Sequence, residues 1–275
     1  MAHGIHRAPP RVGILILALA TMFAGVACAG ASSPPAPRYS CRGWRDFRAP
    51  SPGNDGAKLS SIAALSFSDA WAVGSFDTVP SGSSPPPNPG AGPGPPKTTH
   101  TLVEHWDGSR WRVVPSPSPG SRGLIGGSWL NGVAAVASDD AWAVGGSANS
   151  ETGLIEHWDG TRWTIVKSPV ANLVDASLLA VSASSANDAW AIGTSYANVD
   201  GAAPAYPLVE HRNGTAWELV SVPLRGRGAG LALTGTGPHD IWVLAGMGAT
   251  FRGVMVHFDG RRWGQSASPR RHPAG

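Results

Sequence analysis

The chain has 275 residues and a formal net charge of only +3, and two of its basic residues, Arg7 and Arg11, lie in a leader that we expect to be removed. The remaining charge is too small and too scattered for the basic surface that nucleic-acid binding requires, so no nucleic-acid partner is predicted. The only cysteines are Cys28 and Cys41, which excludes a disulfide-built scaffold. A chain of this length buries enough apolar surface to be held by a core instead.

The first segment has the pattern of a secretory signal peptide. The two arginines precede a nearly unbroken apolar run, residues 12–27, and small residues follow it in Ala27-Cys28-Ala29. This order of basic region, short apolar run and A-x-A site is typical of an exported protein. The run is shorter than the roughly 20 residues that cross a bilayer. We therefore predict a signal peptide over 1–29.

Two outcomes of processing stay open. Cleavage after Ala29 would release the protein, whereas Val26-Ala27-Cys28 and the Ser/Pro/Ala spacer at 30–38 are similar to a bacterial lipoprotein box and its tether. In the second case Cys28 would carry the lipid, although Gly25 stands where that pattern usually has an aliphatic residue. We expect a secreted protein or an outer-surface lipoprotein. Membrane contact would come only through the signal peptide or the lipid.

Residues 39–269 repeat one pattern four times. Asp-Ala-Trp-Ala-Val-Gly at 69–74 returns at 140–145, at 188–193 and, more loosely, at 240–244. Each copy is followed by a second phrase, Glu-His-Trp-Asp-Gly at 104–108, with echoes at 156–160, 210–214 and 256–260. A closing tryptophan ends each unit, at Trp111, Trp163, Trp217 and Trp263. A period of about 50 residues with tryptophan and glycine at fixed offsets indicates a β-propeller or a similar array.

Four short strands are expected in each unit. In the third unit they are 178–184, 188–193 and 208–212, followed by a strand that starts at Trp217, and first strands at 61–66, 132–137 and 230–236 are equivalent. An Asp-Gly or Asn-Gly turn precedes each closing tryptophan, which is a strong hairpin signal. The sequence therefore predicts an all-β fold, a β-propeller of about four four-stranded blades.

The region before the first unit repeats the end of a unit. Trp44 to Gly53 matches Trp111 to Gly120 at its tryptophan, prolines, serine and glycine. This predicts an extra N-terminal outer strand, one strand too many for a simple four-bladed ring and three too few for a five-bladed one. The blade count at closure stays open. Residues 79–97, rich in Pro, Gly and Ser, are expected to form a loop insertion, and 270–275 a polar tail.

The motifs Asp-Ala-Trp-Ala-Val-Gly and Glu-His-Trp-Asp-Gly resemble the Trp-rich propeller repeats of exported bacterial proteins. More distantly, the array is similar to kelch and galactose-oxidase-like propellers. The double glycine of kelch strands is missing, and nothing marks the copper site of galactose oxidase. The resemblance implies a propeller scaffold and leaves the ligand unidentified.

No catalytic, metal or cofactor residues are assigned. The recurring histidines, with His105 as the first, are expected to meet a nearby carboxylate or to span a blade interface, and the aspartates that open each unit, such as Asp69, to cap turns. We do not expect either series to bring its side chains together around one ion, as a zinc or calcium site requires. No nucleophile elbow or phosphate-binding loop is present. Paired carboxylates on loops, as in a polysaccharide hydrolase or lyase, stay an alternative.

The repeat tryptophans are interpreted as packing residues, with stacking on sugars as the alternative. The long loops between second and third strands vary most, and variable loops on a rigid scaffold often carry function. We expect the ligand on that face. Trp129 lies outside the repeat pattern, and we expect it in a loop between units. The candidate contacts are Phe76, Trp129, Tyr196, Tyr206, Phe251 and Arg252.

The favoured hypothesis is an exported binding module, secreted or associated with the envelope, that binds a glycan, a cell-wall component or a protein. A propeller-type polysaccharide hydrolase or lyase is one alternative. A structural propeller completed by self-association is the other.

Overall fold

A computed structural model describes residues 46–82, 96–120, 126–148, 153–169, 175–196 and 204–266. The signal peptide, the spacer, Cys28, the polar tail and most of the 79–97 insertion lie outside these ranges. The described residues form sixteen strands and no helix, so no helix among them could span a membrane.

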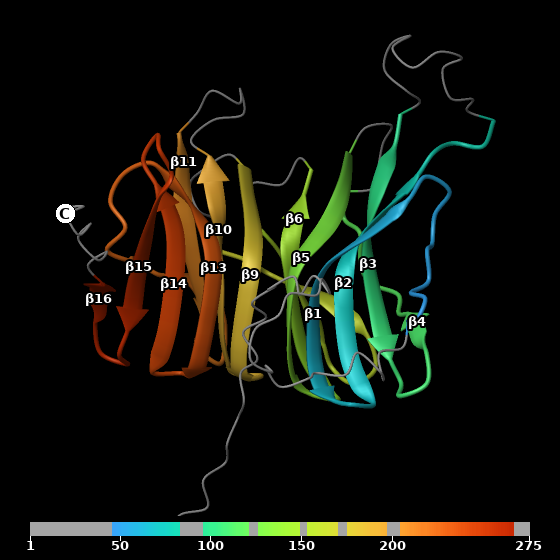
Figure 1. The fold of residues 1–275 in the computed structure, drawn as a ribbon, viewed down its shortest axis with the longest axis horizontal. Helices are drawn as coiled ribbons and strands as arrows, with labels where there is room; N and C mark the ends of the chain where they lie inside the picture. Colours follow the sequence, from blue (N-terminus) through green and yellow to red (C-terminus); the bar gives the residue numbers. More distant parts are fainter. Residues whose placement is uncertain are drawn as a thin grey trace, which may run out of the picture. The chain divides into compact units, whose positions relative to one another are not determined.

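The strands form four consecutive antiparallel units, each running from an inner first strand to a short outer fourth strand (Figure 1). The predicted propeller of four four-stranded blades is confirmed. Blade 1 has β1 (Ala57–Ser66), β2 (Asp69–Thr78), β3 (Thr98–Trp106) and β4 (Trp111–Val113); blade 2 has β5 (Gly126–Ala137), β6 (Asp140–Ser147), β7 (Leu154–Trp158) and β8 (Trp163–Val166); blade 3 has β9 (Asp175–Ser185), β10 (Asp188–Tyr196), β11 (Ala205–Arg212) and β12 (Trp217–Leu219); blade 4 has β13 (Gly228–Gly237), β14 (Asp240–Met247), β15 (Arg252–Phe258) and β16 (Trp263–Ser266).

Blades 1 and 2 are also joined directly. A short parallel pairing connects Thr98 to Gly126 and Thr99 to Gly127, so β3 and β5 belong to one continuous sheet. The first strand of blade 2 begins earlier than the sequence predicts. Trp129, which we expected in a loop between units, lies within β5 and pairs with Gly146 of β6. That expectation was wrong.

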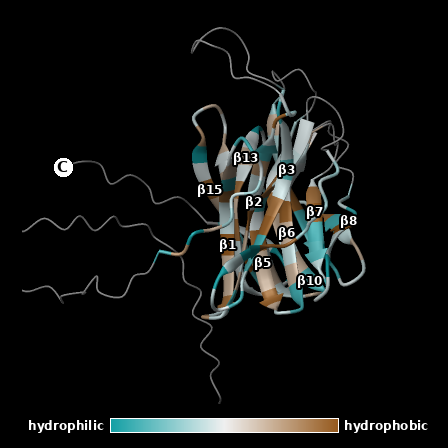
Figure 2. Ribbon diagram, turned by 90° about the vertical axis from the view of Figure 1, so that its right-hand side faces the viewer, coloured by the Kyte–Doolittle hydropathy of each residue, from teal (hydrophilic) through white to brown (hydrophobic). Residues whose placement is uncertain are grey.

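The core consists of three apolar clusters, one at each junction between consecutive blades. Figure 2 colours parts of β5, β6 and β7 as hydrophobic, in keeping with their buried residues. At each junction the closing tryptophan of one blade meets the second-strand tryptophan of the blade before it. Their centroids are 5.3 Å apart for Trp163 and Trp71, and 5.8 Å apart for Trp263 and Trp190. The interpretation of these tryptophans as packing residues is confirmed.

The glycine of the Asp-Ala-Trp-Ala-Val-Gly motif is required by close strand contact. A Cβ at Gly145 would collide with the backbone carbonyl of Trp129, and one at Gly193 with that of Ser177. In blade 4 the equivalent residue is Ala245, and its partner on β13 is Gly230, where blade 3 has Leu178. The space that the motif glycine leaves in other blades is therefore provided by the opposite strand in blade 4.

The described part of the extra N-terminal segment lies against blade 1. Residues 46–50 are assigned to no strand, and Phe47 meets Trp106 edge-on with ring centroids 4.6 Å apart. Phe47 has the same offset from Trp44 as Val114 has from Trp111, and Trp106 is the counterpart of Trp158. Val114 and Trp158 both pack on the cluster between blades 1 and 2. We call the segment between the fourth strand of one blade and the first strand of the next a link. The N-terminal segment therefore packs on blade 1 as the link from a preceding blade would.

Candidate binding surfaces

The six predicted ligand contacts all lie at the end of the blades that carries the loops between second and third strands, which we call the loop end. We call the opposite end, with the Asp-Gly and Asn-Gly turns, the hairpin end. The six contacts are spread over four blades. Phe76 is half-buried near the end of β2 and stacks on His100 of β3, with centroids 5.0 Å apart. Trp129 is half-buried, and its indole lies over Gly146, where a Cβ would touch the ring. Both aromatic rings therefore have intramolecular packing roles.

The two tyrosines do not form one platform. Tyr196 pairs with Ala205, and Tyr206 pairs with Ser195, in the antiparallel register of β10 and β11. Directly paired residues share a face of a sheet, and successive residues alternate between faces. Tyr196 and Tyr206 therefore point to opposite faces of blade 3.

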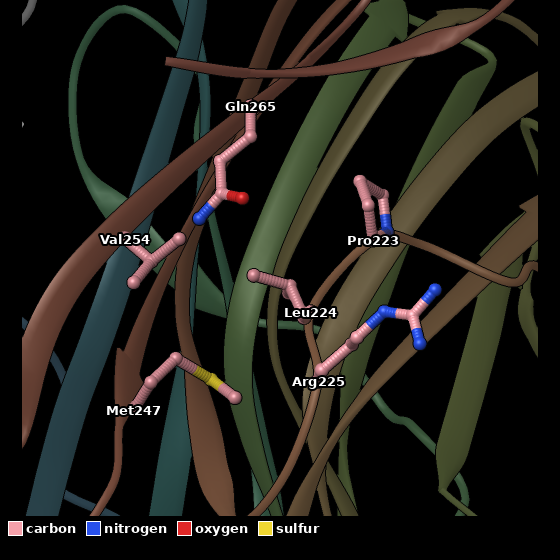
Figure 3. Close-up of a pocket in the computed structure, with 6 residues that line it drawn as sticks. All are labelled: Pro223, Leu224, Arg225, Met247, Val254 and Gln265. Carbon is pink, nitrogen blue, oxygen red and sulfur yellow. The ribbon is translucent and has the colours of Figure 1, made fainter. Parts of the chain in front are cut away.

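Blade 4 combines an apolar cavity with exposed predicted contacts. Phe251 is 62% exposed and takes a positive φ of 48° in the turn before Arg252. A cavity of about 240 Å³ lies at the same end of the blade. Figure 3 shows its side chains around one opening, from the link before blade 4 and from β14, β15 and β16. The lining residues are Pro223, Leu224, Arg225, Met247, Val254 and Gln265.

The loop end of blade 4 carries only positive charge. Arg225, Arg227 and Arg252 are exposed there, and the described residues give none of them an ion pair. The acidic residues between 220 and 266 are Asp240 and Asp259, which lie at the opposite, hairpin end of the blade. The link is fixed to the β14–β15 turn because the Gly248 amide donates to the Arg227 carbonyl, 2.8 Å away. The cavity therefore combines apolar side chains with one guanidinium group, that of Arg225, and Arg227 and Arg252 add positive charge at the same end of the blade.

The same hollow recurs in blade 2 with different chemistry. Pro117, Ser118, Pro119 and Ile165 line it, at the positions of Pro223, Leu224, Arg225 and Gln265. The position of Arg225 is thus a proline in blade 2. The repeat provides a hollow at this position in both blades. Of the two, the hollow of blade 4 contains a cationic side chain, Arg225.

A third hollow, in blade 1, contains two carboxylates. Asp55 and Asp77 line it together with Lys58 and Phe76. Asp55 forms an ion pair with Lys97, and Asp77 accepts a hydrogen bond from the Thr99 hydroxyl at 2.8 Å. Both carboxylates are therefore engaged by neighbouring side chains.

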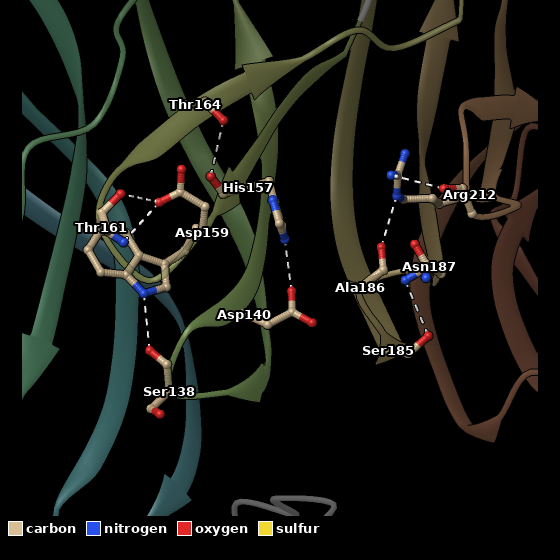
Figure 4. Close-up of polar contacts among 12 residues, drawn as sticks. Ser138, Asp140, His157, Asp159, Thr161, Thr164, Ser185, Ala186, Asn187 and Arg212 are labelled. Carbon is tan, nitrogen blue, oxygen red and sulfur yellow. Dashed lines mark hydrogen bonds and ion pairs between the residues drawn. The ribbon is translucent and has the colours of Figure 1, made fainter.

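Each blade contains an Asp–His–Trp arrangement at the hairpin end. His157 Nε2 lies 2.8 Å from Asp140 Oδ1 (Figure 4), and its ring lies against Trp142 at 4.2 Å between centroids. The pairs His105–Asp69, His211–Asp188 and His257–Asp240 repeat this contact at 2.9, 2.7 and 2.6 Å. The expectation that each histidine meets a carboxylate is confirmed, and each pair stays within one blade.

The expected bonds from turn amides to these aspartates are not found among the described residues. Their carboxylates pair with histidine, as Asp140 does, and in two blades they also accept a hydroxyl across the turn, from Ser184 to Asp188 and from Thr236 to Asp240. The Asp-Gly aspartates accept the turn amides instead. Asp159 Oδ1 accepts from the amides of Thr161 and Arg162, each at 2.9 Å. The hydrogen bond from the Thr161 hydroxyl, together with these two amide bonds, lowers the pKa of Asp159 to about 2.

Three blades bury a glutamate on the third strand. Glu104, Glu156 and Glu210 are 0% exposed. Burial raises the pKa of Glu156 to about 8 and that of Glu210 to about 7. The Ser168 hydroxyl donates to Glu210 at 3.0 Å and partly offsets this rise. The carboxyls are fully buried inside the blades and are not among the residues that line the three hollows.

Sequence reasoning did not identify the blade 4 cavity. Its link residues, Pro223 to Arg225, lie between units and outside the long loops on which the prediction was based. One signal was present: arginine and leucine replace proline and serine at repeat positions. That departure from the repeat could have directed attention to blade 4.

No known protein family and no curated protein matches this chain. A solved structure of YCF48 bound to D1 peptide is similar, with a TM-score of 0.39 and 16% sequence identity. The similarity covers 76% of this chain and 66% of that one, so this chain spans just under two thirds of that protein's length. The fold assignment rests on the four blades themselves.

Proposed function

We propose that this protein is an exported β-propeller binding module that takes an acidic, apolar segment of a partner protein at the loop end of blade 4. The observation that carries the proposal is the blade 4 cavity, in which Arg225 and Gln265 line the same hollow as four apolar residues. Export follows from the predicted signal peptide at 1–29. The lipid anchor at Cys28 is part of the same proposal.

The chemistry of the cavity defines the partner. Leu224, Met247 and Val254 provide apolar contact for one side chain of moderate size. Methionine adapts to different shapes, which suits a protein-binding surface. Arg225 and Arg252 can each bind a carboxylate through paired N–H donors. An apolar residue beside one or two carboxylates matches this surface.

A glycan is less well suited to the same surface. Sugar binding relies on flat aromatic faces, and the tyrosines of blade 3 point to opposite faces of their sheet. None of the described residues that line the cavity is aromatic, and the exposed Phe251 lies over Gly246, on the other face of the sheet from Met247. Aliphatic side chains beside an exposed arginine favour a protein segment, because arginine is enriched at protein interfaces.

The proposal is tested with an array of synthetic peptides probed with the full chain. The array contains acidic–apolar peptides, the same sequences with Asp and Glu changed to Asn and Gln, and basic–apolar peptides. We expect binding to the acidic set alone, weakening as salt rises because the attraction is electrostatic. Arg225→Ala and Met247→Ala should each reduce binding about tenfold or more. Arg252→Ala should reduce it less.

Arg261→Ala is the matched control, since Arg261 is an exposed arginine at the hairpin end of the same blade. It should leave binding unchanged. If Arg261→Ala and Arg225→Ala weakened peptide binding equally, general charge attraction would explain the binding, and the proposed site would be overturned. Binding of glycans by the same chain, with none to any peptide set, would overturn the protein partner.

A further inference from the structure

Blade 4 exposes a surface that the other three blades bury. We call the side of a blade that meets the following blade its trailing face. On this face Trp242 is 41% exposed, whereas its counterparts Trp71, Trp142 and Trp190 are 1%, 1% and 3% exposed. Met255 is 46% exposed, and its counterparts Val103, Ile155 and Val209 are at most 2% exposed. Leu244 is half-buried where the others have fully buried Val or Ile.

Blade 1 exposes the first-strand part of the complementary surface, whereas Ala72 and Leu102 on the same face are 2% and 1% exposed. We call the side of a blade that meets the preceding blade its leading face. Ile62 is 65% exposed in β1, whereas Val133, Val181 and Leu233 at the same register position are 7%, 9% and 9% exposed. Leu59 is 41% exposed, and its counterparts Leu130 and Leu178 are 0% exposed. Blades 1 and 4 lie at opposite ends of the series of blades (Figure 1).

The three internal junctions show which surface covers a trailing face. At each junction, first-strand residues and the closing tryptophan on the leading face of one blade pack on the second-strand tryptophan of the blade before it. Leu130, Val133 and Trp163 do so on Trp71 at the first junction. Exposed contiguous apolar surface of this kind marks an interaction site. Its chemical complement is a leading face of this repeat.

We propose that two copies of this chain associate head to tail, with the leading face of blade 1 in one copy covering the trailing face of blade 4 in the other. Leu59 and Ile62 of one copy then pack on Trp242, Leu244 and Met255 of its partner. Such a contact is heterologous, so it either closes a ring of two copies or extends into a chain of copies. The proposal is independent of the blade 4 cavity.

The N-terminal segment modulates this contact. Phe47 lies on Trp106, in the place of the link from a preceding blade, and Ser266 of a docked blade 4 has the same offset from Trp263 as Phe47 has from Trp44. Two segments cannot occupy one place, so the Phe47 contact must open when the copies associate. Phe47 is 53% exposed, which is consistent with a weakly held segment.

The test is a complementation experiment by sedimentation velocity over a wide range of concentrations. Ile62→Asp blocks the leading face, and Trp242→Asp blocks the trailing face. We expect the wild-type chain to associate, and each variant alone to do so at least about tenfold more weakly. A mixture of the two variants should form a complex of one copy of each, since one intact leading face then meets one intact trailing face.

Ile165→Asp is the matched control, an exposed isoleucine (49%) on the outer strand of blade 2. It should associate as the wild type does. The proposal is overturned by a wild type that stays monomeric, by association of either blocked variant at wild-type strength, or by a mixture that stays monomeric. Thermal unfolding checks that the variants are folded. Ile62→Ser and Trp242→Ser, with the same expected pattern, replace any aspartate variant that unfolds.

Discussion

The indole of Trp217 meets that of Trp142 edge-on, with ring centroids 5.4 Å apart and ring planes at 75°. Trp217 closes blade 3 and Trp142 lies on the second strand of blade 2, so this contact joins two blades. Edge-on aromatic pairs of this geometry contribute beyond their buried area. The equivalent contact is missing from Trp242 among the described residues, although its own ring stacks on His257 at 4.2 Å as in the other blades.

This difference predicts unequal costs for one substitution. Trp142→Ala should lower the free energy of unfolding by about 3–5 kcal/mol, because it empties a buried site between blades. Trp242→Ala should cost about 1 kcal/mol or less, since much of its ring is already in water. Urea unfolding of the dilute chain measures both. Equal costs would mean that Trp242 is covered within a single copy.

The motif glycines give a second prediction. Gly145→Ala should destabilise by about 1–3 kcal/mol, because the added methyl collides with the Trp129 carbonyl and the strands must separate. Gly237→Ala is the control, since a Cβ at that strand position meets nothing within 4 Å. It should be neutral within about 0.5 kcal/mol. Similar losses at both positions would show that backbone flexibility dominates.

The buried glutamates make stability depend on pH. The ordinary pKa is 4.5, and burial raises the pKa of Glu210 to about 7 and that of Glu156 to about 8. Between those values the folded protein keeps protons that the unfolded chain has lost. Their contribution to stability is therefore complete below pH 4.5, falls as pH rises to about 8, and changes little above that.

Glu210→Gln should flatten this decline. We compare the free energy of unfolding of the variant with that of the wild type at each pH. From about pH 5 to about pH 8 this difference should shift by roughly 1–3 kcal/mol in favour of the variant, because glutamine has no proton to lose. Glu218→Gln, at an exposed glutamate of β12, should leave the pH dependence unchanged. Urea unfolding at both pH values provides the comparison. A parallel pH profile for Glu210→Gln and wild type would contradict a protonated Glu210.

The repeat predicted the blades because its strongest signals are local. Tryptophan, glycine and Asp-Gly turns at fixed offsets specify strand, close contact and hairpin without knowledge of other blades. The burial of Glu210 could not be found in this way, because its hydrogen-bond partner Ser168 lies in the link before the blade. One trace of it is present: blade 4 has Val256 in place of the glutamate and Val222 in place of the serine.

The candidate site was harder to predict, for a geometric reason. The strand order determines which residues lie at the loop end, so the sequence could assign the six candidate contacts to that end. The direction of Tyr196 and Tyr206 depends on register, which a shift of one residue reverses. The blade 4 cavity depends on where the Pro223–Arg225 link packs, and link packing has no local signal.

The signal peptide leaves one prediction on export. If Cys28 carries a lipid, Cys28→Ala should move the protein from the membrane fraction into the medium. One acyl chain alone binds a membrane weakly, so stable anchoring would require at least two. Cell fractionation followed by immunoblotting measures the distribution. Recovery of both wild type and variant entirely in the medium would contradict lipidation.

The contact between Phe47 and Trp106 gives the last prediction. If the N-terminal segment competes with a second copy for the leading face of blade 1, then Phe47→Ala should strengthen self-association several-fold, because the competing segment loses its aromatic anchor. Phe67→Ala is the matched control, a phenylalanine 94% exposed in the β1–β2 turn, and it should have no effect. Sedimentation velocity of the full chain reports the change. Weaker association of Phe47→Ala would mean that the segment is part of the interface, as the link of a preceding blade would be.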